Sequence, residues 1–172
     1  KSMASIGAFI AADKDIIDFL KYNLRSQMFA KALPSLLVKG ALKRLDLLRS
    51  NPGLKDKLWE NVDALQNGLK SRGFNIGDTN TCVTPVYLEG SVPVAMMLVN
   101  DLRENYKIFL SIVIYPVIPK GIILLRMIPT ATHTMEDIEQ TLAAFEAIRE
   151  KLENGTYAKL AEIHTVDVSD ER

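Results

Sequence analysis

Arg126 is the residue whose type and surroundings point most directly to chemistry in this 172-residue sequence. It interrupts a run of Ile, Leu and Met between Gly121 and Pro129, and such a run predicts a strand that is buried on at least one face. A guanidinium keeps its charge, so it must face water, pair with a protein carboxylate or bind an anion. On general grounds, an exposed or ion-paired structural arginine is the commoner case.

The residues that follow Arg126 favour anion binding. Pro129 ends the predicted strand, and residues 130–134 (TATHT) lead directly into a helix whose start carries Thr134 and Asp137 at the spacing of a capping box. Arg126, this turn and the helix N-terminus are therefore expected to lie close together. Because an arginine fork and a helix N-terminus both suit a carboxylate, the sequence predicts a site for a carboxylate ligand.

His133 lies within this turn and has two interpretations. Its imidazole either bridges Arg126 to a group of the substrate or caps and packs the turn, and we assign it no catalytic role. With Cys82 and His164 as the only other Cys and His residues, no metal-ligand cluster can be assembled. A single cysteine also excludes an internal disulfide and fits a reducing cytosol, so we expect a cytoplasmic protein without a metal site.

Charge and hydropathy exclude several classes of partner. Lys+Arg and Asp+Glu number 21 each, so the chain has no net charge at pH 7. The sequence has no basic stripe with interleaved aromatic residues, which argues against nucleic acid and anionic membranes as partners. No apolar run approaches the length of a transmembrane segment, and no signal peptide is visible. The sequence begins at Lys1 without an initiator Met, so we expect a fragment of a longer protein.

Apolar periodicity predicts two parts joined by a long helix. In the first part we expect a strand at residues 8–12, a helix from Asp13 to about residue 25, and a helix at residues 34–50. The linking helix, at residues 54–71, has an apolar stripe that is most simply a core face. The expected domain boundaries are 1–50, 51–74, 75–157 and 158–172, the last being a polar tail whose end, from Thr165, is expected to be disordered.

The second part alternates strand and helix signals. Strands are expected at residues 84–88, 108–115 and 121–128, and helices at residues 94–105 and 135–154. The two longest strands are separated only by residues 116–120, which is too short for a crossover, so they should be antiparallel neighbours. The chain is thus assigned to the α/β class, and its second part to a small C-terminal sandwich with a mainly antiparallel sheet and helices on one face.

Four blocks of the sequence form a recognisable series: KSMASIGAF (1–9), MFAKALP (28–34), YPVIPKG (115–121) and LLRMIPTATHT (124–134). Taken in this order, they resemble the α-oxoamine synthases, a family of fold-type I enzymes that depend on pyridoxal 5'-phosphate. The resemblance spans Lys1 to about Tyr157 and is nearest to bacterial serine palmitoyltransferase-like members. Glycine C-acetyltransferases and 8-amino-7-oxononanoate synthases share the same blocks. The resemblance implies that residues 1–50 are the end of a large cofactor-binding domain.

The resemblance also implies roles for individual residues. Lys1 would be the catalytic lysine, which binds the cofactor covalently and then removes the Cα proton of the amino acid. Judged alone, a terminal lysine would simply be solvated. Arg126 would bind the carboxylate of the amino acid through its planar fork.

The implied reaction is the decarboxylative condensation of an amino acid, serine being favoured, with an acyl-CoA, as in sphingolipid biosynthesis. Glycine C-acetyl transfer and 8-amino-7-oxononanoate synthesis are the alternatives. The implied assembly is a homodimer with the active site at the subunit interface, formed through a surface that includes residues 27–34.

Ala30 and Ala32 depart from the family pattern. In the family, this loop carries hydroxyl residues, one of which reaches the cofactor phosphate of the neighbouring subunit. Because Ala30 and Ala32 have no hydroxyl, backbone N–H groups of the loop or Lys31 would contact the phosphate instead. The cofactor-binding residues that precede the lysine in the family are absent from this sequence, so the chain alone is expected to be inactive.

Two interpretations from other classes remain open. Heteromeric relatives contain a non-catalytic subunit that stabilises an active one, although Lys1 argues against that role here. Without the resemblance, the sequence would fit a carboxylate-binding or oligomerisation module built on the helical hairpin and the small sheet.

Overall fold

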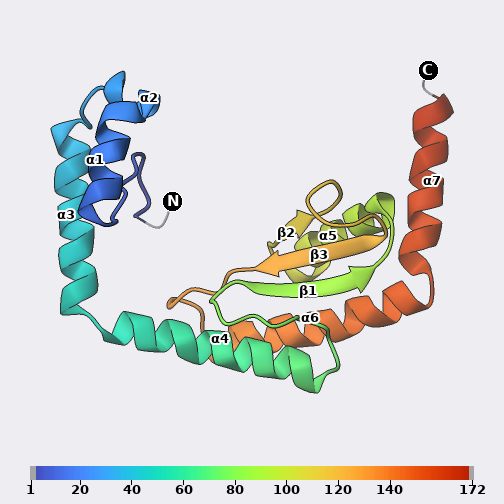
Figure 1. Cartoon of the computed structure of the whole chain (residues 1–172). Coiled ribbons are helices and arrows are strands. Elements are labelled where there is room, and N and C mark those ends of the chain that lie inside the picture. The colour runs from blue at the N-terminus through green and yellow to red at the C-terminus, as the bar shows by residue number, and fades with distance from the viewer. Residues whose placement is uncertain (1–2, 171–172) are drawn as a thin grey trace. The chain divides into compact units, whose positions relative to one another are not determined.

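The computed structural model describes the backbone of residues 3–170 and the side chains through Ile163 (Figure 1). The chain divides into two compact units, residues 1–52 and residues 53–172. Lys1, which the resemblance makes the catalytic lysine, lies outside the described residues.

The first unit contains the helices α1 (Lys14–Asn23), α2 (Arg25–Met28) and α3 (Ser35–Ser50). The positions of α1 and α3 agree with the two predicted helices. The prediction of a strand at residues 8–12 is wrong, because this segment forms no β-ladder. A strand needs a neighbour for its N–H and C=O groups, and no described segment pairs with residues 8–12.

The side chains of the first unit leave much apolar surface uncovered. Among residues 3–52 none is buried, and the exposed fraction reaches 86% for Phe9, 79% for Leu36 and 74% for Phe29. Burial of one such side chain stabilises a protein by about 1.5–3 kcal/mol, and side chains exposed to water do not make this contribution. An apolar surface of this extent is typical of a face that packs against other protein.

The second unit has an α/β fold built on one small sheet. Its elements are α4 (Gly53–Ser71), β1 (Thr84–Glu89), α5 (Val92–Tyr106), β2 (Ser111–Val113), β3 (Ile122–Met127), α6 (Met135–Glu153) and α7 (Thr156–Asp170). The sheet is antiparallel with the order β1-β3-β2, so β3 is the central strand (Figure 1). The predicted fold class and the antiparallel pairing of the last two strands are confirmed.

The core of the second unit lies between one face of the sheet and the helices. Alternate residues of the strands are buried there, including Val86, Ile123, Leu125 and Met127, and they join a cluster with residues of α4, α5 and α6. Arg126 lies on the opposite face of β3 and is exposed. Helices cover one face of the sheet, in agreement with the alternation of buried and less buried positions along β3.

Three segments differ from the sequence-based expectations. The strand expected at residues 108–115 is reduced to Ser111–Val113, and the peptide bond between Tyr115 and Pro116 is cis. The expected linking helix corresponds to α4, which packs on α6 and belongs to the second unit. In the tail, α7 continues to Asp170 where the sequence led us to expect disorder. No helix in the described part of the chain combines the length and apolar character needed to cross a membrane.

Asp101 of α5 connects this helix to α6 and α7. Its carboxylate accepts hydrogen bonds from Lys151 Nζ at 2.8 Å, the Tyr157 hydroxyl at 2.6 Å and Asn105 Nδ2 at 2.6 Å. Burial alone would raise the pKa of Asp101, but these three hydrogen bonds together hold the pKa below its ordinary value of 3.8.

This cluster leads to a prediction about pH and stability. A carboxylate with a depressed pKa stabilises the fold above its unfolded-state pKa, and this contribution is lost as the pH falls through the folded-state value. Asp101→Asn is therefore expected to lower the free energy of unfolding at neutral pH and to flatten its decline below about pH 4. Urea denaturation of both proteins at neutral and acidic pH measures this. If the free energy of unfolding decreased equally in the two proteins between neutral and acidic pH, the Asp101 carboxylate would have no stabilising role.

Candidate active site

Arg126 lies on the open face of the central strand, opposite Pro85 of β1 and Ser111 of β2. Its Nε donates a hydrogen bond to Ser111 Oγ at 3.0 Å, which fixes the base of the guanidinium. Within the described part of the chain, no carboxylate lies within 4.0 Å of Arg126, and its two terminal nitrogens make no hydrogen bond. The guanidinium is thus not part of a structural ion pair there, and its planar fork is free to bind an external anion.

The start of α6 carries the predicted capping box. Thr134 Oγ1 accepts a hydrogen bond from the backbone N–H of Asp137 at 3.2 Å, and the Asp137 carboxylate accepts one from the N–H of Thr134 at 2.8 Å. The backbone N–H of Thr134 is the main cause that lowers the pKa of Asp137. Two of the N–H groups at this helix start, those of Thr134 and Asp137, are therefore engaged within the capping box. Arg126 is the charged donor that remains available to an anion beside this turn.

The turn between β3 and α6, residues 130–133, is fixed from two sides. Within the turn, the N–H of Thr130 donates to His133 Nδ1 at 3.0 Å and the N–H of His133 donates to the Thr130 carbonyl at 3.3 Å. From α4, the side-chain amide of Asn61 donates to the carbonyls of Thr130 and His133 at 2.9 and 2.8 Å. Of the two interpretations of His133, packing and capping within the turn is the one that these contacts support.

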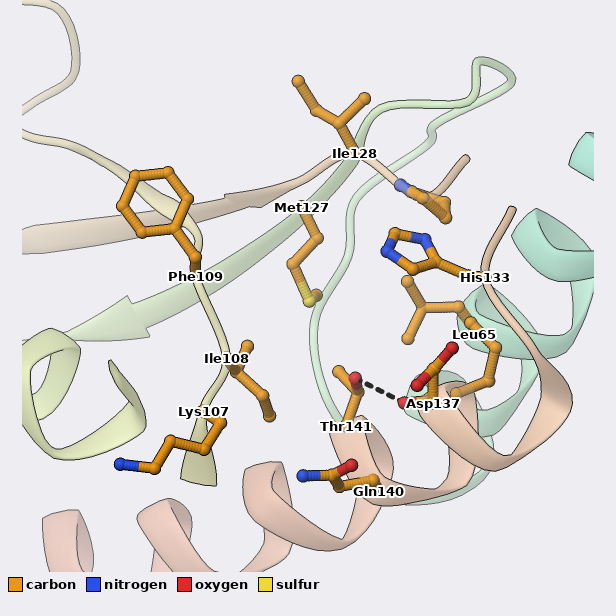
Figure 2. A pocket seen from close by; sticks show the side chains of 12 residues that line it. Leu65, Lys107, Ile108, Phe109, Met127, Ile128, His133, Asp137, Gln140 and Thr141 are labelled. Carbon is orange, nitrogen blue, oxygen red and sulfur yellow. Dashed lines mark hydrogen bonds between the residues drawn. The ribbon is translucent and has the colours of Figure 1, made fainter. Parts of the chain in front are cut away.

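His133 and Arg126 are not joined by any contact that the described residues make. The imidazole lines a cavity of about 180 Å³ together with Leu65 of α4, Met127 and Ile128, whereas Arg126 is not among the lining residues (Figure 2). Arg126, the turn and the helix N-terminus are therefore close along the backbone, as expected. Their side chains do not form a hydrogen-bonded cluster in the described part of the chain.

The loop at residues 29–34 of the first unit offers donors for an anion. Ala30 and Lys31 line a cavity of about 610 Å³ with Ser26 and Gln27. Within the described part of the chain, the backbone N–H groups of residues 30–33 donate no hydrogen bond, and Lys31 has no carboxylate partner. Free amides, an ammonium group and a hydroxyl form a donor set that suits a phosphate group. The donors of the loop suit the phosphate of a cofactor chemically, although most of the other side chains that line the cavity are apolar.

Comparison with known proteins gives consistent matches over most of the chain. The family model of aminotransferase class I and II matches residues 1–145. A cysteate-C-fatty acyltransferase of Capnocytophaga ochracea is 66% identical over 170 residues, which are 99% of this chain and 40% of the relative. An 8-amino-7-oxononanoate synthase of Exiguobacterium sibiricum is 33% identical over 153 residues, 89% of this chain and 39% of the relative.

The structural comparison agrees with the sequence matches. A solved structure of the serine palmitoyltransferase SPT with PLP superposes with a TM-score of 0.75 at 28% identity, and the match covers 86% of this chain and 37% of that chain. This chain therefore spans about 40% of the length of the relatives that it matches.

This chain belongs to the aminotransferase class I and II family, whose model matches most of its length. Its relatives confirm the resemblance to the α-oxoamine synthases, and the solved relative with PLP confirms the cofactor of the family. No group of His, Cys, Asp and Glu in the described residues is arranged to hold a metal ion.

Two residues of the site were not identified from the sequence. Ser111, which supports the guanidinium, could have been found from the register, because antiparallel pairing across a short connection places it opposite Arg126. Asn61 left a clearer signal, since it is a polar residue between Leu58 and Leu65 on the apolar stripe of the predicted helix. Such a buried amide must have partners elsewhere in the fold.

Proposed function

We propose that this chain forms part of a pyridoxal phosphate-dependent acyltransferase that condenses an amino acid with a fatty acyl-CoA. The observation that carries the proposal is the 66% identity, over 99% of the chain, with a cysteate-C-fatty acyltransferase. In the net reaction, a bond forms between the amino acid Cα and the acyl carbonyl carbon, the thiolate of CoA leaves, and the carboxylate departs as CO₂.

The residues of this chain would contribute as follows. Pyridoxal phosphate, when bound, supplies an electron sink for the bonds at the substrate Cα. Lys1 would hold the cofactor covalently and take the Cα proton. The free amides of residues 30–33 and the ammonium group of Lys31 would bind the cofactor phosphate across a homodimer interface. Arg126 would hold the amino acid carboxylate and so orient the Cα.

We propose cysteate as the amino acid and keep serine as the second candidate. The sequence alone favoured serine, and the 28% identical structure of SPT supports that choice. The relative named for cysteate shares more than twice that identity and matches nearly the whole chain, which favours cysteate.

The test is a substrate comparison with the full-length enzyme, a long-chain acyl-CoA and cysteate, serine or glycine in turn. A site that binds the cysteate sulfonate with charge-assisted hydrogen bonds should give a kcat/KM for cysteate at least about tenfold above that for serine. A preference for serine would make the protein a serine acyltransferase. A protein that condenses none of these amino acids and stays colourless with added cofactor would support the non-catalytic subunit instead.

A further inference from the structure

Asn61 is a fully buried amide on the apolar face of α4. Its exposed fraction is 0%, and its buried neighbours on the helix include Val62 and Leu65. An amide in such a place destabilises the fold unless its polar atoms find partners. The atoms that it contacts therefore indicate why it is there.

Both contacts of Asn61 are made with the turn at residues 130–133. Its Nδ2 donates to the carbonyls of Thr130 and His133, which are 69 and 72 positions away in the sequence. Its Oδ1 is buried and has no hydrogen-bond partner in the described part of the chain. A leucine has a similar shape and would avoid this unpaired acceptor, so the two bonds to the turn are the contribution that only the amide makes.

The bonds from Asn61 also determine how the imidazole of His133 is held. The turn places His133 Nδ1 where it accepts the N–H of Thr130, so in the neutral ring the proton is on Nε2. Nε2 is then a donor at the cavity that His133 lines. Asn61 fixes the carbonyl ends of the same turn, and hence the position of this donor.

The turn immediately follows the strand that carries Arg126. Residues 128–134 are the whole connection between β3 and α6, and Asn61 attaches this connection to α4. A connection held at two of its carbonyls cannot slide along the strand axis without breaking two hydrogen bonds. These two bonds add to the ladders with β1 and β2 in holding the end of β3, close to Arg126.

We infer that Asn61 is a positioning residue for the amino acid substrate, acting through the turn at residues 130–133 on Arg126. The inference rests on the proposed function of Arg126. Asn61 itself contacts neither cofactor nor substrate.

The test uses Asn61→Leu and Asn61→Asp in the full-length enzyme, with Tyr157→Phe as the control. Asn61→Leu removes both donors at nearly constant shape, and Asn61→Asp, when protonated, keeps one donor. Tyr157→Phe removes a different buried hydrogen bond of the same unit, the one to Asp101. We expect Asn61→Leu to raise the KM of the amino acid about tenfold while the KM of acyl-CoA stays within about twofold. The KM of the amino acid in Asn61→Asp should lie between the values for Asn61→Leu and the parent.

Hydrogen exchange of the backbone amides at residues 130–133 gives a second readout that does not need activity. These amides should exchange faster in both Asn61 variants than in the parent, and should be unchanged in Tyr157→Phe. Equal losses of melting temperature in all three variants, with both KM values unchanged and normal exchange in the turn, would reduce Asn61 to a structural residue. If the parent enzyme itself condenses no amino acid, the proposed function fails, and the exchange data alone then show whether Asn61 orders the turn.

Discussion

Replacing Lys1 by alanine in the full-length enzyme is expected to abolish turnover, with a loss of at least about 10⁴-fold in kcat. The reason is that one amine is assigned two tasks, the covalent attachment of the cofactor and the removal of the Cα proton. The melting temperature should stay within a few degrees of the parent value, because a lysine side chain contributes little to a core.

A second readout of the Lys1 variant does not depend on turnover. Borohydride should fix the cofactor covalently to the parent protein and fail to do so in Lys1→Ala, which the mass of the intact protein shows directly. Lys39→Ala removes an exposed lysine of α3 and is the matched control, with parent-like turnover and labelling expected. Residual turnover near the parent level, or labelling that persists in Lys1→Ala, would assign the catalytic amine to another residue.

Replacing Arg126 should weaken binding of the amino acid selectively. Arg126→Lys keeps the charge but loses the planar fork, and a charge-assisted pair is worth about 1.5–3 kcal/mol, so the apparent affinity should fall roughly tenfold to a hundredfold. Arg126→Ala should bind the amino acid more weakly still. The affinity for acyl-CoA should be nearly unchanged, because the role proposed for the guanidinium is to bind only the carboxylate of the amino acid.

The structure gives Arg126 a suitable control and a clear alternative. Arg103 is another exposed arginine of the second unit, and Arg103→Lys should leave both affinities at the parent value. If Arg126 had only a structural role, its variants would lower the melting temperature without preference between the two substrates. The absence of a carboxylate within 4.0 Å in the described residues already disfavours that outcome.

Local signals were sufficient for much of the second unit. The capping box of Thr134 and Asp137, followed by an apolar stripe, correctly placed α6, and the short connection before Gly121 correctly predicted antiparallel pairing. These features depend on residues close together in the sequence, so a pattern along the chain can reveal them. The sequence left open whether Arg126 faces water, pairs with a protein carboxylate or binds an anion, and the structure shows its side chain exposed.

Other features depend on partners that no local pattern contains. Residues 8–12 have the composition of a strand, but a strand forms only where another strand accepts its hydrogen bonds. The bonds of Asn61 join positions 69 and 72 apart, so no pattern near Asn61 in the sequence indicates their acceptors. Sequence periodicity identified the helices and strands, whereas these contacts could be identified only from the arrangement of those elements in space.

The most direct test of the carboxylate site compares the amino acid with its carboxamide in binding to the parent enzyme and to Arg126→Ala. The carboxamide keeps the size of the ligand and removes its charge, so the comparison isolates the pairing between guanidinium and carboxylate. The parent enzyme should bind the amino acid at least about tenfold more tightly than the carboxamide, and Arg126→Ala should bind the two almost equally. An undiminished preference for the carboxylate in Arg126→Ala would show that another residue binds it.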